Sequence, residues 1–152
     1  MVDYNELKKL REETGVSFSL CKKALEETAN DVAKAKEKLK EWGKLRAKEK
    51  AGSVTSEGAL FSYVHHNNKV VSLVEIQCET DFVSKNNEFQ QFGKEIAMQI
   101  ASSRPKDVKA LLAQEYNRDP SKKIEDLLKE NVLKFGENLK IVRFARWELG
   151  GE

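Results

Sequence analysis

The sequence has few of the residues that enzymes and metal proteins use for their chemistry. Only two cysteines and two histidines occur among 152 residues, and neither pair has the spacing of a CxxC or zinc motif. The adjacent His65 and His66 would point to opposite faces of a strand, so they cannot easily share a metal ion. The sequence contains no glycine-rich phosphate loop and no GxSxG or HExxH motif. Since no nucleophile with an oriented base can be assembled, we expect no enzyme, no metal site and no cofactor.

Long apolar runs and a strong charge of either sign are also missing. No stretch approaches the roughly 18 apolar residues of a membrane-spanning helix, and the acidic, helical N-terminus does not resemble a signal peptide. We therefore expect no association with a membrane. The formal net charge is only +2, which argues against direct binding to nucleic acid. Cys21 and Cys78 lie among apolar neighbours, as in the core of a reduced protein. We therefore expect a complete, cytoplasmic protein.

Residues 1–50 predict a module of three short helices. Capping residues and a glycine stop mark their ends, at Asp3 or Asn5, Gly15, Ser17 and Asn30-Asp31. This order resembles a ubiquitin-associated module, in which the exposed loop of residues 15–18, Val16 and Phe18 among them, would bind a partner. Packing of Phe18 inside the bundle explains the residues equally well, and both interpretations stay open.

Residues 58–152 predict a small α+β domain that follows a linker at residues 51–57. The expected strands are 59–65, 70–77 and 138–149, and the expected helices are 87–101, 106–115 and 124–135, with Asp107 and Ser121 as caps. The first two strands flank an asparagine-rich turn and predict a β-hairpin. The predicted fold is thus a three-helix module, a linker, and an antiparallel three-stranded sheet with helices packed on one face, in the order β-β-α-α-α-β.

A polar turn joins the second strand to the next helix and contains Thr80, Asp81, Phe82 and Val83. Thr80 is expected to cap the helix that follows, with the next three residues in its first turn. Asp81 would then be favoured by the helix dipole alone, and Phe82 would pack into the core. The other interpretation is that this carboxylate and this ring act on a partner.

Three blocks of the sequence closely resemble the bacterial elongation factor Ts family and occur in that family's order. They are LREETGVSFSLCKKALEE followed by ND, GALFSYVHHNNKVVSLVEIQCETDFVSKNNEFQQFGKEIAMQIA, and KFGENLKIVRFARWELG. The resemblance implies a translation factor that exchanges guanine nucleotides on elongation factor Tu and binds it in GDP-bound and nucleotide-free forms. It also implies that Thr80, Asp81, Phe82 and Val83 dislodge Mg²⁺ from that GTPase. Arg11 and Phe18 would dock the N-terminal module on it.

The long members of that family carry two related copies of the sheet-and-helix unit, whereas this sequence has one. Short members form homodimers in which the second chain supplies the missing half. The resemblance therefore implies an isologous homodimer through the exposed sheet edge and apolar residues such as Phe144 and Trp147. Two other functions stay open: an adaptor that only binds its partner, and a nucleic-acid binder, which the nearly balanced charge disfavours.

Overall fold

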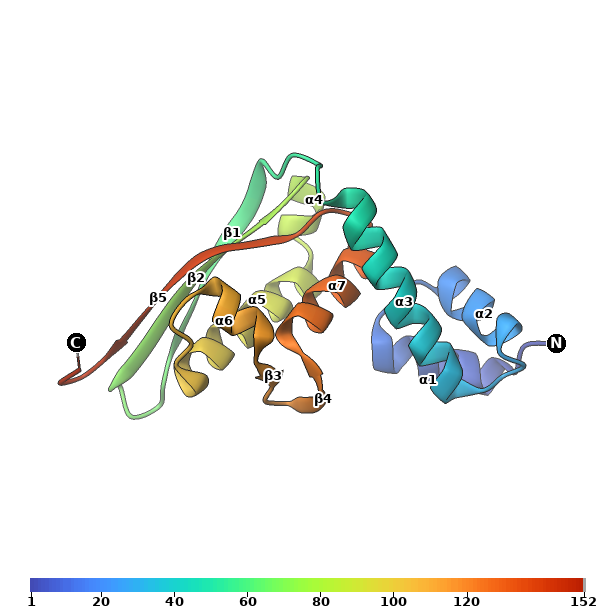
Figure 1. Ribbon diagram of the computed structural model, residues 1–152, viewed down its shortest axis with the longest axis horizontal. Coiled ribbons are helices and arrows are strands. Elements are labelled where there is room, and N and C mark those ends of the chain that lie inside the picture. Colours follow the sequence, from blue (N-terminus) through green and yellow to red (C-terminus); the bar gives the residue numbers. More distant parts are fainter. Residues whose placement is uncertain (152) are drawn as a thin grey trace. The chain divides into compact units, whose positions relative to one another are not determined.

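The computed structural model describes residues 1–151 and divides into two compact units (Figure 1). The first unit is Met1–Gly52 together with Leu128–Gly136, and the second is Ser53–Leu127 together with the chain from Glu137 onward. The fold is α+β, with N-terminal helices followed by a three-stranded antiparallel sheet and its helices, which confirms the predicted fold class.

The first unit contains the three predicted helices, α1 (Tyr4–Thr14), α2 (Phe18–Glu27) and α3 (Val32–Lys50). Each begins at a side-chain cap that accepts from a backbone N–H of the first turn. The caps are Asp3, Ser17 and Asp31. Asp3 rather than Asn5 therefore starts α1. Gly15 ends that helix in the left-handed conformation, at a φ of 68°.

The core of the first unit comes mainly from apolar positions at helical spacing. The buried side chains are Leu7, Leu10, Val16, Cys21, Ala24, Leu25, Ala35 and Leu39. Leu133, from the late helix α7 (Ile124–Phe135), packs against this core. A bundle of three short helices buries little apolar surface, so this fourth helical segment adds stability that residues 1–50 alone would lack.

The second unit is built on the sheet β1–β2–β5, whose strands are β1 (Glu57–Val64), β2 (Val70–Cys78) and β5 (Lys140–Glu148). All neighbours are antiparallel, and a bulge interrupts the β2–β5 register between Glu75 and Ile76. Figure 1 shows β5 running beside β2 along the sheet. The three strands that the sequence predicts for this sheet are confirmed.

The helices α4 (Asp81–Ser84), α5 (Asn87–Ser103) and α6 (Val108–Ala113) belong to the same unit. Helix α5 lies directly on β1 and β2. At Gly93 a Cβ atom would lie 2.2 Å from Cδ2 of Phe61, so only glycine lets helix and strand approach this closely. The Ser72 hydroxyl donates to the Ala97 carbonyl at 2.6 Å and adds a polar link to the apolar packing.

The two faces of the sheet differ in cover. Val74 and Ile76 are fully buried beneath the helices, and Arg146 donates through Nε to the Ala101 carbonyl of α5. Phe144 pairs with Val74 and so shares that covered face. Trp147 is 74% exposed. Phe144 and Trp147 therefore lie on opposite faces of the sheet, because strand residues three positions apart alternate in direction, and only Trp147 lies on the uncovered face.

A short hairpin of β3 (Glu115–Tyr116) and β4 (Asp119–Lys123), which the sequence does not predict, lies between the two predicted helices 106–115 and 124–135. The Gln99 side chain of α5 holds it, donating to the Glu115 carbonyl at 3.1 Å and accepting from the Asn117 N–H at 3.0 Å. Asp107 caps α6 as predicted, but Ser121 lies within β4 and caps no helix.

The two histidines follow β1, which ends at Val64. Their ring centroids lie only 4.2 Å apart, so the expectation of opposite faces is wrong: these residues belong to the turn and not to the strand. Residues 1–151 hold no cluster of three His, Cys, Asp or Glu side chains arranged to bind a metal ion. None of the helices in that part of the chain combines the length and apolar character that crossing a bilayer requires.

Candidate functional site

The turn of residues 80–83 follows the end of β2 and contains a one-turn helix of its own. Thr80 has extended backbone angles, and its hydroxyl accepts from the Val83 N–H at 3.4 Å, so it caps α4. Asn86 caps α5 separately by accepting from the Glu88 N–H at 2.7 Å. As the sequence predicts, Thr80 caps the helix that follows it, with residues 81–83 in the first turn, but this helix ends at Ser84 and the second cap at Asn86 starts the long helix six residues later.

Phe82 and Val83 have opposite environments within this turn. Phe82 is 86% exposed, whereas Val83 is only 8% exposed. Phe82 therefore does not pack into the core, and Val83 anchors the turn in its place. An exposed phenylalanine on an ordered helical turn leaves its apolar surface in water, where it is accessible to a partner.

Asp81 is exposed in the first turn of α4, where the helix dipole favours a carboxylate. Its Oδ2 lies 3.5 Å from Nζ of Lys85, one turn later. A surface pair at this distance contributes little to stability. The Asp81 carboxylate is thus available to a partner at small cost.

Glu137 fixes the start of the turn from the other end of the chain. Its Oε1 accepts from the N–H groups of Glu79 and Thr80 at 3.1 and 3.0 Å, and its Oε2 accepts from the Thr80 hydroxyl at 2.6 Å. The Glu79 carboxylate in turn accepts from the Asn138 N–H at 2.5 Å. Sequence reasoning missed Glu137, since no local pattern connects it with residues more than fifty positions earlier.

The loop of residues 15–18 lies in the first unit and differs from its expected form. Val16 is 2% exposed and packs in the core, so the prediction of an exposed Val16 is wrong. Its side chain turns inward because the bundle has so few apolar residues that the loop must contribute one. Phe18 is 43% exposed at the first position of α2, and Arg11 is exposed on α1.

The two cysteines are free and buried, as the sequence predicts. Burial raises the pKa of Cys78 to about 11 and also raises the pKa of Cys21. A thiol with a raised pKa is a poor nucleophile at neutral pH. Each thiol instead donates to a nearby carbonyl, Cys78 to that of Thr80 at 3.2 Å and Cys21 to that of Val16 at 3.6 Å.

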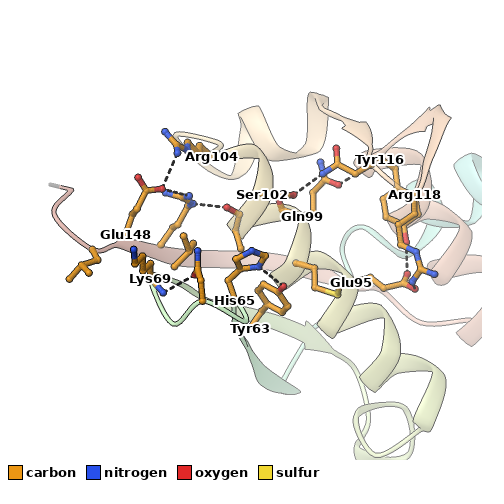
Figure 2. A pocket seen from close by; sticks show the side chains of 17 residues that line it. Tyr63, His65, Lys69, Glu95, Gln99, Ser102, Arg104, Tyr116, Arg118 and Glu148 are labelled. Carbon is orange, nitrogen blue, oxygen red and sulfur yellow. Dashed lines mark hydrogen bonds and ion pairs between the residues drawn. The ribbon is translucent and has the colours of Figure 1, made fainter.

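A cavity of about 600 Å³ opens on the helix side of the sheet, and its polar side chains largely satisfy one another (Figure 2). Glu148 accepts from Arg104 and Arg146, both at 2.9 Å, and the Arg146 hydrogen bond lowers the pKa of Glu148. Glu95 accepts from Tyr116 and Arg118 on the opposite wall. None of the residues that the sequence predicts for function lines this cavity.

Comparison with protein families gives two matches that together cover most of the chain. Residues 79–152 match the family described as "Elongation factor TS", and residues 2–49 match "Elongation factor Ts, mitochondrial, N-terminal". The first match includes the turn of residues 80–83, and the second includes the loop of residues 15–18.

Curated relatives agree with the family matches over nearly their whole length. The chain is 39% identical to elongation factor Ts of Coprothermobacter proteolyticus, with 95% of this chain and 96% of that protein covered. It is 37% identical to the protein of Thermoanaerobacter sp. strain X514 (99% and 96% covered) and 38% identical to that of Leptospira biflexa (99% and 98%). The Thermoanaerobacter alignment spans 195 positions and this chain has 152 residues, so at least 43 of those positions face gaps in this chain.

Proposed function

Since the chain belongs to the elongation factor Ts family and is therefore a translation elongation factor, we propose that it is a guanine-nucleotide exchange factor. Its substrate is elongation factor Tu with GDP bound, and the product is the nucleotide-free complex. The observation that carries this proposal is the 86% exposure of Phe82 on a turn whose backbone N–H groups, at Glu79 and Thr80, donate to the Glu137 carboxylate.

The proposed mechanism acts on the magnesium ion of the GTPase. Mg²⁺ bridges a bound nucleotide's phosphates to the protein and accounts for part of the nucleotide affinity. The Phe82 ring enters between elements of the GTPase that hold this ion, and the Asp81 carboxylate competes for their polar groups. Mg²⁺ then leaves and GDP dissociates. The coupling is reciprocal, so GDP weakens binding of the factor by the same ratio. No covalent bond is made or broken.

The four residues of the turn have different tasks in this mechanism. Asp81 and Phe82 contact the partner, because their side chains are exposed. Thr80 starts the helical turn that presents them, and Val83 ties that turn to the core. A rigid presentation suits a wedge, because ordering a mobile loop on binding would cost part of the binding free energy.

We also propose that the first unit supplies binding affinity through Arg11 and Phe18. Both side chains are accessible, and Phe18 exposes an aromatic edge next to the Ser17 cap. Val16 supports this loop from inside and makes no partner contact. Exposed aromatic and arginine side chains are the types that most often dominate binding energy at protein interfaces.

A homodimer is proposed through the uncovered face of the sheet. This outer face presents apolar side chains from all three strands, namely Leu60, Val64, Leu73 and Trp147. Soluble monomers rarely leave a contiguous apolar patch of this kind in water. A second copy would cover it with an identical patch, as a two-fold axis requires. In sedimentation velocity we expect a dimer that Trp147→Glu dissociates, and a wild-type species with the mass of one chain would contradict the proposal.

The exchange function is tested by release of mant-GDP from elongation factor Tu. The wild-type chain should accelerate release, and Asp81→Ala/Phe82→Ala should lose most of that acceleration while keeping its fold, because both side chains are exposed. Tyr4→Ala is the matched control, since it removes an exposed ring far along the sequence from the turn. Equal acceleration by the double variant and the wild type would contradict the role of the turn. Tight binding without any acceleration would favour an adaptor.

A further inference from the structure

The Glu137 carboxylate lies where the β2–β5 ladder has ended. The ladder pairs Ile76 with Ile141 and Gln77 with Lys140. The same register, continued past these pairs, brings Glu79 opposite Asn138 and Thr80 opposite Glu137. No backbone pair is formed at these positions, and the two carboxylates take its place.

We propose that Glu137 is a positioning residue for nucleotide exchange, which holds the turn of residues 80–83 in its active geometry. This inference rests on the exchange function proposed above. Three hydrogen bonds reach the Glu137 carboxylate, from the Glu79 N–H, the Thr80 N–H and the Thr80 hydroxyl. A charged acceptor makes stronger hydrogen bonds than a neutral one, so these groups are held more firmly than a ladder carbonyl would hold them.

The Thr80 hydroxyl transmits this restraint to the partner-binding residues. Its single proton is donated to Glu137 Oε2 at 2.6 Å, so a lone pair is left to accept from the Val83 N–H at 3.4 Å. That second bond is the cap that starts α4. The orientation of the α4 turn, and with it the direction of the Phe82 ring, therefore depends on the Glu137 carboxylate.

Glu79 and Asn138 make the restraint reciprocal. The Glu79 carboxylate accepts from the Asn138 N–H, and the Asn138 side chain donates to the Ser53 carbonyl at 3.0 Å. The segment after β2 and the segment before β5 thus each cap the backbone of the other. Glu137 itself contacts no nucleotide or partner in this scheme, and it acts through Thr80.

The first test separates positioning from folding. In GDP release from elongation factor Tu, Glu137→Ala should lower the release rate at saturating factor by about tenfold. The variant loses hydrogen bonds to a charged acceptor, whose free energy corresponds to a factor of this order. The half-saturating concentration should change less than about twofold, since the exposed contact residues remain. The isosteric Glu137→Gln should fall between Glu137→Ala and the wild type, and Glu115→Ala serves as a control at an exposed carboxylate of the same unit. A wild-type saturating rate for Glu137→Ala would overturn the proposal.

Substitutions of Thr80 test whether its hydroxyl is needed for the saturating release rate. Thr80→Ser keeps the hydroxyl and should retain the saturating rate, whereas Thr80→Val keeps the volume, loses the hydroxyl and should resemble Glu137→Ala. In an Asp81→Ala/Phe82→Ala background, Glu137→Ala should have no further effect, because Glu137 acts only through those residues. If Glu137→Ala lowered the saturating release rate in that background as much as it does in the wild type, the proposal would be overturned.

Amide hydrogen exchange in the free protein distinguishes failure of this inference from failure of the exchange function. The N–H groups of Glu79 and Thr80 should exchange at least about tenfold faster in Glu137→Ala than in the wild type. If Asp81→Ala/Phe82→Ala exchanges nucleotide as the wild type does, the role of the turn fails whatever the amides show. If that variant is inactive but the two amides stay protected in Glu137→Ala, only the inference about Glu137 fails.

Discussion

The turn of residues 80–83 and the loop of residues 15–18 both present a phenylalanine side chain, but different contacts hold the two segments. Each places a phenylalanine in the first turn of a helix that a hydroxyl side chain caps: Phe18 is one residue after Ser17, and Phe82 is two residues after Thr80. Phe82 is 86% exposed and Phe18 is 43% exposed. The turn is held by a carboxylate from the far end of the chain, whereas the loop is held by its own Ser17 cap and by the buried Val16.

Under the proposed function, this difference predicts different roles for the turn and the loop. The exposed Phe82 ring lies on a turn that hydrogen bonds hold in one conformation. It can therefore displace groups of a partner without losing its own orientation, which suits an effect on the rate of nucleotide release. A half-buried ring on a locally held loop adds contact area and suits affinity. Kinetic parameters separate the two tasks, because a residue that matters only in the transition state changes the maximal rate and not the half-saturating concentration.

The largest effect is expected from the two buried thiols, which report on the two regions separately. Cys78 donates to the Thr80 carbonyl and Cys21 to the Val16 carbonyl. Because burial raises the pKa of Cys78 to about 11, the thiolate fraction near pH 8 should be about 100-fold below that of a thiol with the usual pKa. Iodoacetamide labelling followed by mass spectrometry should therefore be slow in the native protein and fast in urea.

The order and pH dependence of labelling sharpen the comparison. Cys21 should react before Cys78, since the loop is held by fewer bonds and its unit has the smaller core. A raised pKa means that the thiolate forms only at higher pH, so the Cys78 rate should climb as the pH rises from about 9 to 11. Earlier labelling of Cys78 would show that the turn is the looser region.

A smaller effect is expected from Gly93, which lets α5 approach the strand beneath it. Gly93→Ala places a Cβ atom 2.2 Å from the Phe61 ring and should lower the free energy of unfolding by about 1–3 kcal/mol in urea titrations. Gly52→Ala is the matched control, because nothing lies within 4 Å of its added Cβ. Gly93→Ala should also speed labelling of Cys78 and leave Cys21 unchanged. Equal acceleration at both thiols would mean that the two units unfold together.

The smallest effect is expected from Phe18. Phe18→Ala should raise the half-saturating concentration for GDP release by about tenfold, the range of a moderate interface contact, and leave the saturating rate within about twofold. Titration of the variant against elongation factor Tu with mant-GDP measures both values. A reduced saturating rate with an unchanged half-saturating concentration would place Phe18 in the exchange step.

Local sequence signals were sufficient for most of the fold. The valines, leucine and isoleucine of residues 70–77 predict β2, and the apolar spacing of residues 124–135 predicts α7 with the observed bounds. The caps Asp3, Ser17 and Asp107 were also correct. These features depend on neighbours within one or two turns, so the sequence alone carries them.

Long-range contacts account for the errors. The β3–β4 hairpin depends on Gln99, whose side chain bonds the backbone of Glu115 and Asn117. The inward direction of Val16 depends on the small core of its unit, and the bracing of the turn depends on Glu137. Gln99 and Glu137 are far in sequence from the segments that they hold, so periodicity and capping rules cannot indicate them. The opposite faces of Phe144 and Trp147, by contrast, follow from strand alternation alone.

Removal of Mg²⁺ tests most directly whether the turn acts on the magnesium ion. GDP release from elongation factor Tu is measured with saturating wild-type factor and with saturating Asp81→Ala/Phe82→Ala, in Mg²⁺ and in EDTA. We expect the wild type to be about 100-fold faster than the variant in Mg²⁺, which corresponds to about 2.7 kcal/mol. That difference should shrink to less than about tenfold in EDTA, because no ion is left to displace. An equal difference in both conditions would show that Asp81 and Phe82 accelerate release by a route that does not involve Mg²⁺.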